Sequence, residues 1–302
     1  MAESWLVTGA LGCIGAWTVK ALAEEGAQVA GYDLGSDESR IRAITDVQVE
    51  VVSGDVADRA ALDRALDERE VTHVVHLAAL LIPQIKADPP RGTTVNVIGT
   101  THVLDAAKTR GIQVAYASSA AVFSRADPSP VAHDADGHPV TFYGVHKHAC
   151  EGLARIFWAE ERVPSIGLRP YVVYGPGRDT GLTAAPSLAM AAAARGEGYR
   201  IPFGGRMQLQ FAADAGRAFV AAARGATEGA RVFNLGTPAV HMSECVAAIE
   251  AAAPGAEVTF DDTQLPFPDE YESASFERAL GPFEWTPLEA GVQRTVEHYR
   301  SG

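Results

Sequence analysis

The first two thirds of the chain alternates short hydrophobic runs with longer amphipathic stretches. Runs rich in β-branched and other apolar residues, typical of buried strands, occur at residues 5–8, 28–32, 47–52, 73–77 and 112–116. Helical patterns follow at residues 14–25, 59–69 and 94–110, and a helix at 142–161 precedes a strand at 165–169. This alternation predicts an α/β fold, a parallel sheet doubly wound by helices on both faces.

The regular alternation ends after Tyr171, where glycine and proline become frequent. We therefore expect two units of unequal size. Residues 1–178 form the main domain, to which residues 208–236 return. Residues 179–207 and 237–302 form a smaller C-terminal lobe that covers one edge of the sheet and binds the substrate.

Three glycines lie between the first predicted strand and the first predicted helix. Gly9, Gly12 and Gly15 allow a tight turn and a close approach of the backbone to a pyrophosphate, which the N–H groups of the helix N-terminus attract. The pattern predicts a dinucleotide site. Its alternative is a loop that opens the helix and binds no ligand.

The second predicted strand ends at Asp33, 18 residues after Gly15, where a carboxylate accepts hydrogen bonds from a ribose. A carboxylate repels a 2′-phosphate, and no arginine follows directly, so NAD is favoured over NADP. Arg40 is the one nearby cation that would reverse this preference. The alternative for Asp33 is a solvated turn residue.

Tyr143 and Lys147 are four residues apart and so share one face of a helix. A nearby ammonium favours the phenolate, which suits the tyrosine to move a proton at a carbinol oxygen while a hydride moves at its carbon. Ser118 and Ser119 close the fifth strand, at the edge of the sheet where ligands bind. Alone, a Tyr-x-x-x-Lys pattern is common by chance; beside the glycine motif and the serine pair, chance explains it poorly.

With these motifs the sequence resembles the extended short-chain dehydrogenases/reductases, the NAD-dependent epimerase/dehydratase family, over nearly the whole chain. The resemblance implies a Rossmann-type fold, NAD as cofactor, a homodimer paired through residues 94–110 and 142–161, and catalytic Ser119, Tyr143 and Lys147. The residues that it implies at the cofactor are Gly9, Gly12, Cys13, Ile14, Gly15, Asp33, Asp55, Val56, Leu77, Ala78, Ala79, Asn96, Tyr143, Lys147 and Pro170.

Departures from the family pattern bear on the substrate. Ala120 and Ala121 stand where related dehydratases carry an Asp-Glu pair, which disfavours elimination of water. Val172 and Gln208 replace residues with which nucleotide-sugar epimerases hold a diphosphate, so a smaller sugar, sugar acid or similar alcohol becomes plausible. The candidate substrate contacts are Ser118, Ser119, Tyr143, Tyr171, Arg178, Arg206 and Gln208. Exposed loop positions are the alternative for the arginines and the glutamine.

Composition narrows the remaining function classes. With 25 basic and 38 acidic residues the formal net charge is −13, which argues against a nucleic-acid partner. Three cysteines without paired spacing favour a reducing compartment. The N-terminus carries no basic leader and no apolar run is long enough for a bilayer, so we expect a soluble, cytoplasmic protein without a membrane or metal site.

These observations predict an NAD-dependent oxidoreductase that transfers a hydride at a secondary alcohol carbon, with the tyrosine as acid/base. The nearest alternative is an epimerase, which uses the same residues but returns the hydride and retains its NAD. A third hypothesis is a non-catalytic sensor of NAD. The presence of Ser119, Tyr143 and Lys147 argues against such a sensor.

Overall fold

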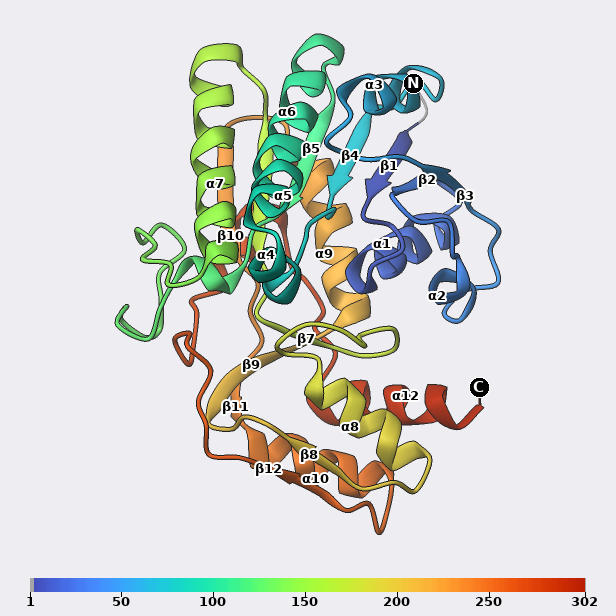
Figure 1. The fold of residues 1–302 in the computed structure, drawn as a ribbon, viewed down its shortest axis with the longest axis vertical. Helices are drawn as coiled ribbons and strands as arrows, with labels where there is room; N and C mark the ends of the chain where they lie inside the picture. The colour runs from blue at the N-terminus through green and yellow to red at the C-terminus, as the bar shows by residue number, and fades with distance from the viewer. Residues whose placement is uncertain (1–2, 302) are drawn as a thin grey trace.

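A computed structural model describes residues 3–301, and its largest element is a seven-stranded parallel sheet (Figure 1). The strands lie in the order β10 (Ala230–Asn234), β6 (Ser165–Arg169), β5 (Gln113–Ala117), β4 (His73–His76), β1 (Ser4–Thr8), β2 (Gln28–Asp33) and β3 (Glu50–Ser53). All neighbouring pairs are parallel. The predicted doubly wound α/β fold is confirmed.

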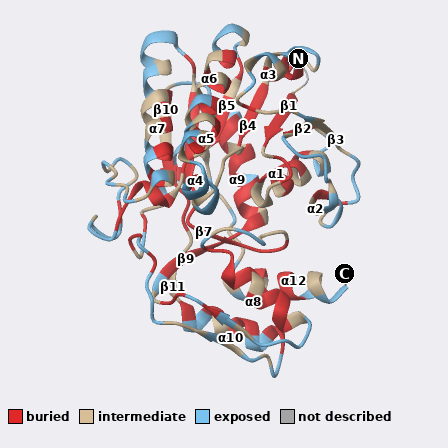
Figure 2. Cartoon of the chain, in the orientation of Figure 1, coloured by how far each residue is buried: buried red, intermediate tan, exposed pale blue. Residues whose placement is uncertain are grey.

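Helices cover both faces of this sheet. The strand β1 shows how the sequence divides between them, since Trp5 and Val7 point to one core and Leu6 to the other. The first core is covered by α1 (Cys13–Glu24) and α9 (Ala212–Gly225), the second by α3 (Arg59–Asp67), α6 (Gly99–Arg110) and α7 (Phe142–Glu161). Figure 2 shows buried residues concentrated in the strands and on the inner faces of these helices.

The long helical segment expected at residues 94–110 begins earlier and is not regular. A short helix α5 (Pro89–Thr93) starts it, and Asp88 caps that helix by accepting from the Arg91 N–H at 3.0 Å. A π-helical turn, η1 (Thr94–Ile98), joins α5 to α6. Such turns mark positions where a side chain is re-aimed. Here the turn carries Asn96, whose side chain is buried.

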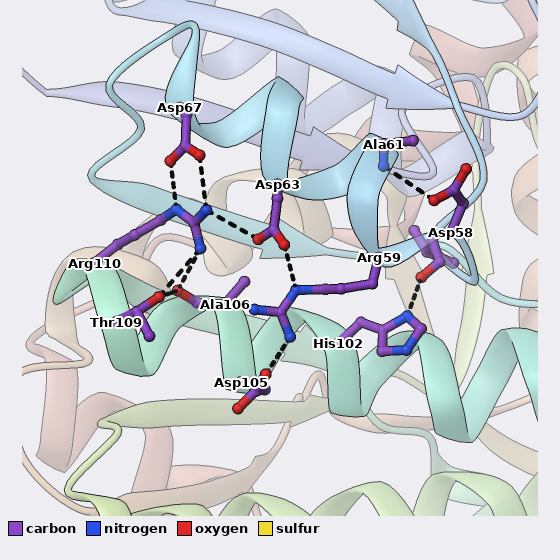
Figure 3. A network of polar contacts seen from close by, with 11 residues as sticks. Asp58, Arg59, Ala61, Asp63, Asp67, His102, Asp105, Ala106, Thr109 and Arg110 are labelled. Atoms are coloured by element: carbon purple, nitrogen blue, oxygen red, sulfur yellow. Dashed lines mark hydrogen bonds and ion pairs between the residues drawn. The ribbon is translucent and has the colours of Figure 1, made fainter.

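An ion-pair network on the surface joins α3 to α6 (Figure 3). Arg59 contacts Asp63 at 2.9 Å and also Asp105, and Arg110 contacts Asp63 at 2.9 Å and Asp67 at 2.7 Å. Each pair is partly exposed and therefore contributes at most about 1 kcal/mol. The apolar contacts beneath it, not the charges, hold α3 against the sheet.

The lobe contains two small sheets and three helices. One sheet has the order β11 (Ala239–His241), β9 (Arg206–Phe211) and β7 (Val172–Tyr174), and the other pairs β12 (Val258–Phe260) with β8 (Tyr199–Ile201). Packed on them are α8 (Ala185–Ala194), α10 (Met242–Ala252) and α12 (Leu288–Ser301). In Figure 1 the lobe lies below the main sheet.

The boundary between main domain and lobe differs from the expected one in three places. Residues 172–174 leave the main sheet, because Pro170 has no N–H for the ladder and the Tyr171 N–H is taken by Gln210 Oε1 at 2.9 Å. Conversely, α11 (Ala274–Leu280) lies against the main domain, where Phe276 packs into the core beside Phe233. The return of the chain to the main domain starts at α9, after β9 has joined the lobe.

Three shorter elements complete the described chain: α2 (Ser39–Arg42), α4 (Ile82–Ala87) and the 3₁₀ turn η2 (Ala120–Val122). All three cysteines are free thiols. Desolvation raises the pKa of Cys13 to about 11, so its place at the start of α1 does not activate it. Within residues 3–301, none of the helices combines the length and apolarity needed to cross a membrane.

Candidate active site

A cavity lies at the carboxyl ends of the central strands, the edge where ligands bind in folds of this type. The main domain contributes the glycine loop, the ends of β4 and β5, and the first turns of α7. The lobe side is closed by Tyr171, Val173 and Phe267. The cavity therefore collects side chains that the sequence keeps more than 250 residues apart.

The glycine loop is packed too tightly for any larger residue. Gly9 has φ +71°, and a Cβ there would lie 2.6 Å from the Ala78 nitrogen. A Cβ on Gly15 would lie 2.1 Å from the Gly9 carbonyl oxygen. Gly12 is the N-cap of α1 and has no side chain to satisfy the N–H groups of the first turn. Gly12, Cys13 and Ile14 all line the cavity. This cradle fits a dinucleotide pyrophosphate.

At the end of β2, Asp33 is tied to the glycine loop. Its Oδ2 accepts from the Leu11 N–H at 3.0 Å. Arg40 lines the cavity but is already committed, since its guanidinium donates to the Leu11 carbonyl and pairs with Asp179 at 2.6 Å. A carboxylate at the end of β2 and an arginine held elsewhere both agree with NAD rather than NADP.

The other residues expected on the adenine side lie next to this loop, outside the cavity lining. Asp55 forms an ion pair with Arg91. Although burial opposes it, hydrogen bonds from the Ala57 N–H and from Arg91 lower the pKa of the Asp55 carboxyl. Val56 is buried, and its carbonyl contacts His102 Nδ1 at 3.0 Å. Asp55 is thus an anion at neutral pH, held at the carboxyl end of β3.

The segment after β4 forms the wall between the two halves of the cofactor site. Leu77 and Ala79 line the cavity, and Ala78 packs against Gly9. Asn96 does not reach the cavity: its Oδ1 accepts from the Leu80 N–H at 2.7 Å and its Nδ2 donates to the Leu80 carbonyl at 3.0 Å. The π turn in the helical segment therefore serves to hold this wall in place.

The expected acid/base residues come together at the start of α7. Thr141 caps the helix by accepting from the Gly144 N–H at 3.0 Å. Lys147 is only 3% exposed, and its Nζ donates to the Ala117 carbonyl at 2.6 Å and lies 5.7 Å from the ring centre of Tyr143. Ser119 follows at the end of β5, where its Oγ accepts from the Ala121 N–H at 3.1 Å. All three catalytic candidates line one cavity.

A neutral histidine lies beneath this cluster. Burial, and then the charge of Lys147, lower the pKa of His76 to about 3. Its Nδ1 lies 2.7 Å from Thr8 Oγ1 and its Nε2 lies 3.0 Å from Thr100 Oγ1. Because Thr100 donates its own proton to the Asn96 carbonyl, it accepts from His76 Nε2. His76 is therefore a neutral group hydrogen-bonded between two threonines, next to the charge of Lys147.

The candidate substrate contacts separate into two groups. Tyr171, Arg178, Ser118 and Pro170, the last expected at the cofactor, line the cavity. Arg206 does not: it projects from β9 and donates to the Ala239 carbonyl at 2.7 Å. Gln208 is buried in the lobe, where its amide donates to the carbonyls of Thr237 and Tyr271 at 2.8 and 3.0 Å. We therefore remove Arg206 and Gln208 from the candidate set.

Sequence reasoning missed a segment that covers the glycine loop, residues 175–183, here called the strap. Trp17 Nε1 donates to the Pro176 carbonyl at 3.0 Å, and the Gly177 N–H donates to Tyr299 Oη at 3.2 Å. The ion pair of Arg40 with Asp179 closes it from the other side. Three glycines with positive φ, at positions 175, 177 and 181, are the signal that marks it in the sequence.

Comparison with known proteins places this site in a family. The family model of the NAD dependent epimerase/dehydratase family matches residues 5–236. UDP-glucose 4-epimerase of Mycolicibacterium smegmatis is 29% identical over 319 residues, covering 98% of each chain. UDP-glucuronate 4-epimerase 6 of Arabidopsis thaliana is 31% identical over 185 residues, and this match covers 57% of this chain and only 40% of that protein.

Among solved structures, L-threonine dehydrogenase from Clostridium difficile has a TM-score of 0.86 at 21% identity, covering 99% of this chain and 98% of that one. This likeness shows a common fold. The family match extends from β1 through β10 and includes every residue that lines the cavity except Phe267. Because the family model matches well over half of the chain, the chain belongs to the NAD-dependent epimerase/dehydratase family and is an NAD-dependent enzyme.

Proposed function

We propose that the enzyme transfers a hydride between NAD and a secondary alcohol carbon of a small polyhydroxy substrate, a sugar or a sugar acid. The observation that carries this proposal is the position of Tyr143 and Lys147, on one helix face, in the cavity that the glycine loop also lines. When bound, NAD supplies the group that accepts or returns the hydride. Residues of the chain itself donate and accept the proton.

In this mechanism the Tyr143 phenol exchanges a proton with the substrate hydroxyl. The buried ammonium of Lys147, 5.7 Å from the phenol ring centre, stabilises the phenolate. Lys147 is itself held by the Ala117 carbonyl, which fixes its charge beside the tyrosine. Ser119 supplies a hydroxyl that hydrogen-bonds the same substrate oxygen. Its neighbours Ala120 and Ala121 are buried and carry no acid or base for elimination.

The lobe supports a substrate without a nucleotide. The side-chain NH₂ groups of Gln208 and Gln210 donate to backbone carbonyls inside the protein, whereas the buried Gln208 Oε1 meets no hydrogen-bond partner within residues 3–301. An aromatic group stands beside them: Tyr171 contacts Phe267 and Tyr271 edge-on, with ring centres 6.0 and 5.1 Å apart. The Tyr271 hydroxyl donates to the Ala120 carbonyl at 3.2 Å, which fixes this wall next to Ser119. With this aromatic wall next to Ser119, the cavity has room for a compact substrate.

Arg178 supports an acidic group on that substrate. It lines the cavity, and its guanidinium donates to Thr183 Oγ1 at 3.2 Å. Its buried Nε meets no hydrogen-bond partner within residues 3–301. A buried donor without an acceptor is costly, and a ligand carboxylate or phosphate would satisfy it.

Substitution of Arg178 tests this part of the proposal. We expect Arg178→Gln to raise KM for an acidic substrate about 10- to 100-fold, the loss of one charge-assisted hydrogen bond, and to change KM for a neutral analogue little. Arg206→Gln, an arginine outside the cavity, is the matched control. An equal rise in KM for neutral and acidic compounds would assign Arg178 a general structural role instead.

The proposed function itself is tested by absorbance of reduced nicotinamide. The protein is mixed with NAD and, separately, with sugars, sugar acids, amino acids and nucleotide sugars. Growth of the reduced-nicotinamide band with a non-nucleotide sugar or sugar acid supports the proposal. Conversion of a nucleotide sugar without net reduction of NAD would favour the epimerase, the activity named for the two relatives above. No conversion of any non-nucleotide compound would overturn our proposal.

We further propose that the enzyme is a homodimer paired through α7. Residues 142, 145, 149, 152 and 156 follow a three-four spacing along this helix, here called the α7 stripe. Phe142, Val145 and Ile156 are 59, 50 and 47% exposed, and Ile98 on the neighbouring π turn is 44% exposed. These four are half of the eight large exposed hydrophobic residues in the part of the chain that the structure describes. A concentration of this kind favours a second copy of the chain as partner.

A charged residue introduced into the α7 stripe is expected to dissociate the dimer. Val145→Glu places a carboxylate at the centre of the stripe, and burying an unpaired charge is strongly unfavourable. Sedimentation or light scattering then gives the mass of one chain, against two for the wild type. Leu34→Glu is the control, since Leu34 is 67% exposed but lies in the loop after β2. A wild type of one-chain mass at micromolar concentration would contradict the dimer.

A further inference from the structure

Glu151 lies on α7 one turn beyond Lys147, so that Tyr143, Lys147 and Glu151 follow each other on one face of the helix. Its carboxylate forms a two-pronged ion pair with Arg169, in which Nε and Nη2 each donate at 2.7 Å. The Arg169 side chain is 5% exposed and that of Glu151 10%. Glu151 also accepts a hydrogen bond from the hydroxyl of Ser118. No part of the proposed proton transfer uses this pair.

The pair is anchored on its far side as well. The remaining Nη1 of Arg169 donates to the His133 carbonyl at 2.8 Å and lies 3.3 Å from Asn234 Oδ1. The Asn234 amide in turn donates to the carbonyls of Val131 and Glu272, both at 3.1 Å. The Arg169 guanidinium, at the carboxyl end of β6, is therefore held by the end of β10 and by the loop at residue 133. It in turn holds Glu151 in place. The Glu151 carboxylate thus accepts from three donors, two on Arg169 and one on Ser118.

The helix α7 contacts two consecutive residues of the β5 end. Lys147 Nζ donates to the Ala117 carbonyl at 2.6 Å, and Glu151 binds the hydroxyl of Ser118, the next residue. The backbone of Ser118 is fixed from the other side, since its N–H donates to the Leu168 carbonyl at 2.8 Å. Ser119 follows directly. The position of its hydroxyl relative to Tyr143 thus depends on how the preceding residue is held.

We propose that Glu151 is a positioning residue that, braced by Arg169, holds Ser118 and thereby fixes the Ser119 hydroxyl against Tyr143 and Lys147. This inference rests on the proposed function, because it assigns a role in the same proton transfer. It changes the role of Ser118, whose hydroxyl points to Glu151 and so orients its neighbour instead of recognising the substrate. A misplacement of a reacting group by about 1 Å is enough to lower turnover strongly.

The test uses Ser118→Ala, because it removes the hydrogen bond and leaves the buried ion pair intact. Glu151→Gln removes the charge opposite a buried arginine and is expected to destabilise the fold. We expect Ser118→Ala to lower kcat about tenfold while KM and the Kd of NADH, read from its fluorescence, change less than about twofold. Ser165→Ala is the matched control: Ser165 is fully buried in β6, and its hydroxyl has no partner within residues 3–301.

A double-mutant cycle isolates the mechanism. If Ser118 acts through Ser119, then Ser118→Ala has little further effect in a Ser119→Ala background. A rise in KM with unchanged kcat would make Ser118 a substrate contact and overturn the proposal. Unchanged kcat and KM, or fully additive effects of the two substitutions, would overturn it as well.

A crystal structure of Ser118→Ala separates this inference from the proposed function, since it needs no substrate. We expect the Ser119 hydroxyl to be displaced or to occupy several rotamers, while α7 keeps its place. A Ser119 side chain unchanged from the wild type would overturn the positioning role, even if no substrate of the enzyme were found. If Ser119 moves but the wild type converts no compound, the proposed function fails and the structural coupling stands.

Discussion

Tyr143→Phe is expected to lower kcat by about 10²- to 10⁴-fold, the usual contribution of a positioned general acid/base. Phenylalanine keeps the ring beside Lys147 and removes only the hydroxyl, so the Kd of NADH should stay within about threefold of the wild type. Turnover is followed by reduced-nicotinamide absorbance with the substrate found in the screen, and cofactor binding by fluorescence.

Tyr199→Phe, in β8 of the lobe, controls for the loss of a tyrosine hydroxyl as such. Retention of most turnover in Tyr143→Phe would move the acid/base role to another group. Tyr143→Phe also tests the third hypothesis of the sequence analysis, a non-catalytic NAD sensor, against which family membership already speaks. Such a protein would respond to NAD equally well with tyrosine or phenylalanine at this position.

The second large effect is expected at the cofactor loop. In Gly15→Ala the new Cβ would lie 2.1 Å from the Gly9 carbonyl oxygen, far inside contact distance, so the loop backbone must move. Overpacking of this kind costs about 1–3 kcal/mol, which corresponds to roughly a 5- to 150-fold weaker binding of NADH if the strain falls on the binding conformation. The gain in Tm on adding NAD should shrink accordingly.

Gly152→Ala is the control for the same chemical change. Gly152 lies in the α7 stripe, away from the cavity, and in the single chain there is open space where a Cβ would be placed. Alanine there is expected to leave NADH binding unchanged, and sedimentation checks that it leaves the pairing of the chains unchanged too. Wild-type affinity in Gly15→Ala would show that the loop adapts without cost. In that case the glycine pattern would reflect helix packing and not the cofactor.

The sequence predicted the central strands well because each is a short apolar run buried on both faces. Helical spacing brought Tyr143 and Lys147 together, and the end of a predicted strand brought the pair Ser118 and Ser119 to the same edge. These are local relations. A local pattern indicates which residues share a face or an edge, whereas the choice of Ser119 came from the family resemblance.

Contacts between distant segments were beyond such reasoning. The alternation of side chains along β9 predicts which of them share a face of the strand. Only the pairing of β9 with β7 and β11 decides that neither Arg206 nor Gln208 reaches the cavity. The ion pair of Glu151 with Arg169 depends on how α7 lies across β6. The strap follows no periodic pattern at all, because its course is set by Trp17, Arg40 and Tyr299, which are far away in the sequence.

The order of strands in the main sheet also bears on how the enzyme is made. β10 completes the sheet beside β6, yet about sixty residues separate them in the chain, first part of the lobe and then α9. At about 5–20 residues per second, a ribosome delivers β10 several seconds after β6. During that time the backbone groups of residues 165–169 present an unpaired edge, which other chains can extend. A fragment that includes β6 but stops before residue 230 keeps this edge permanently. We expect such fragments to aggregate on expression, whereas the chain that includes β10 does not.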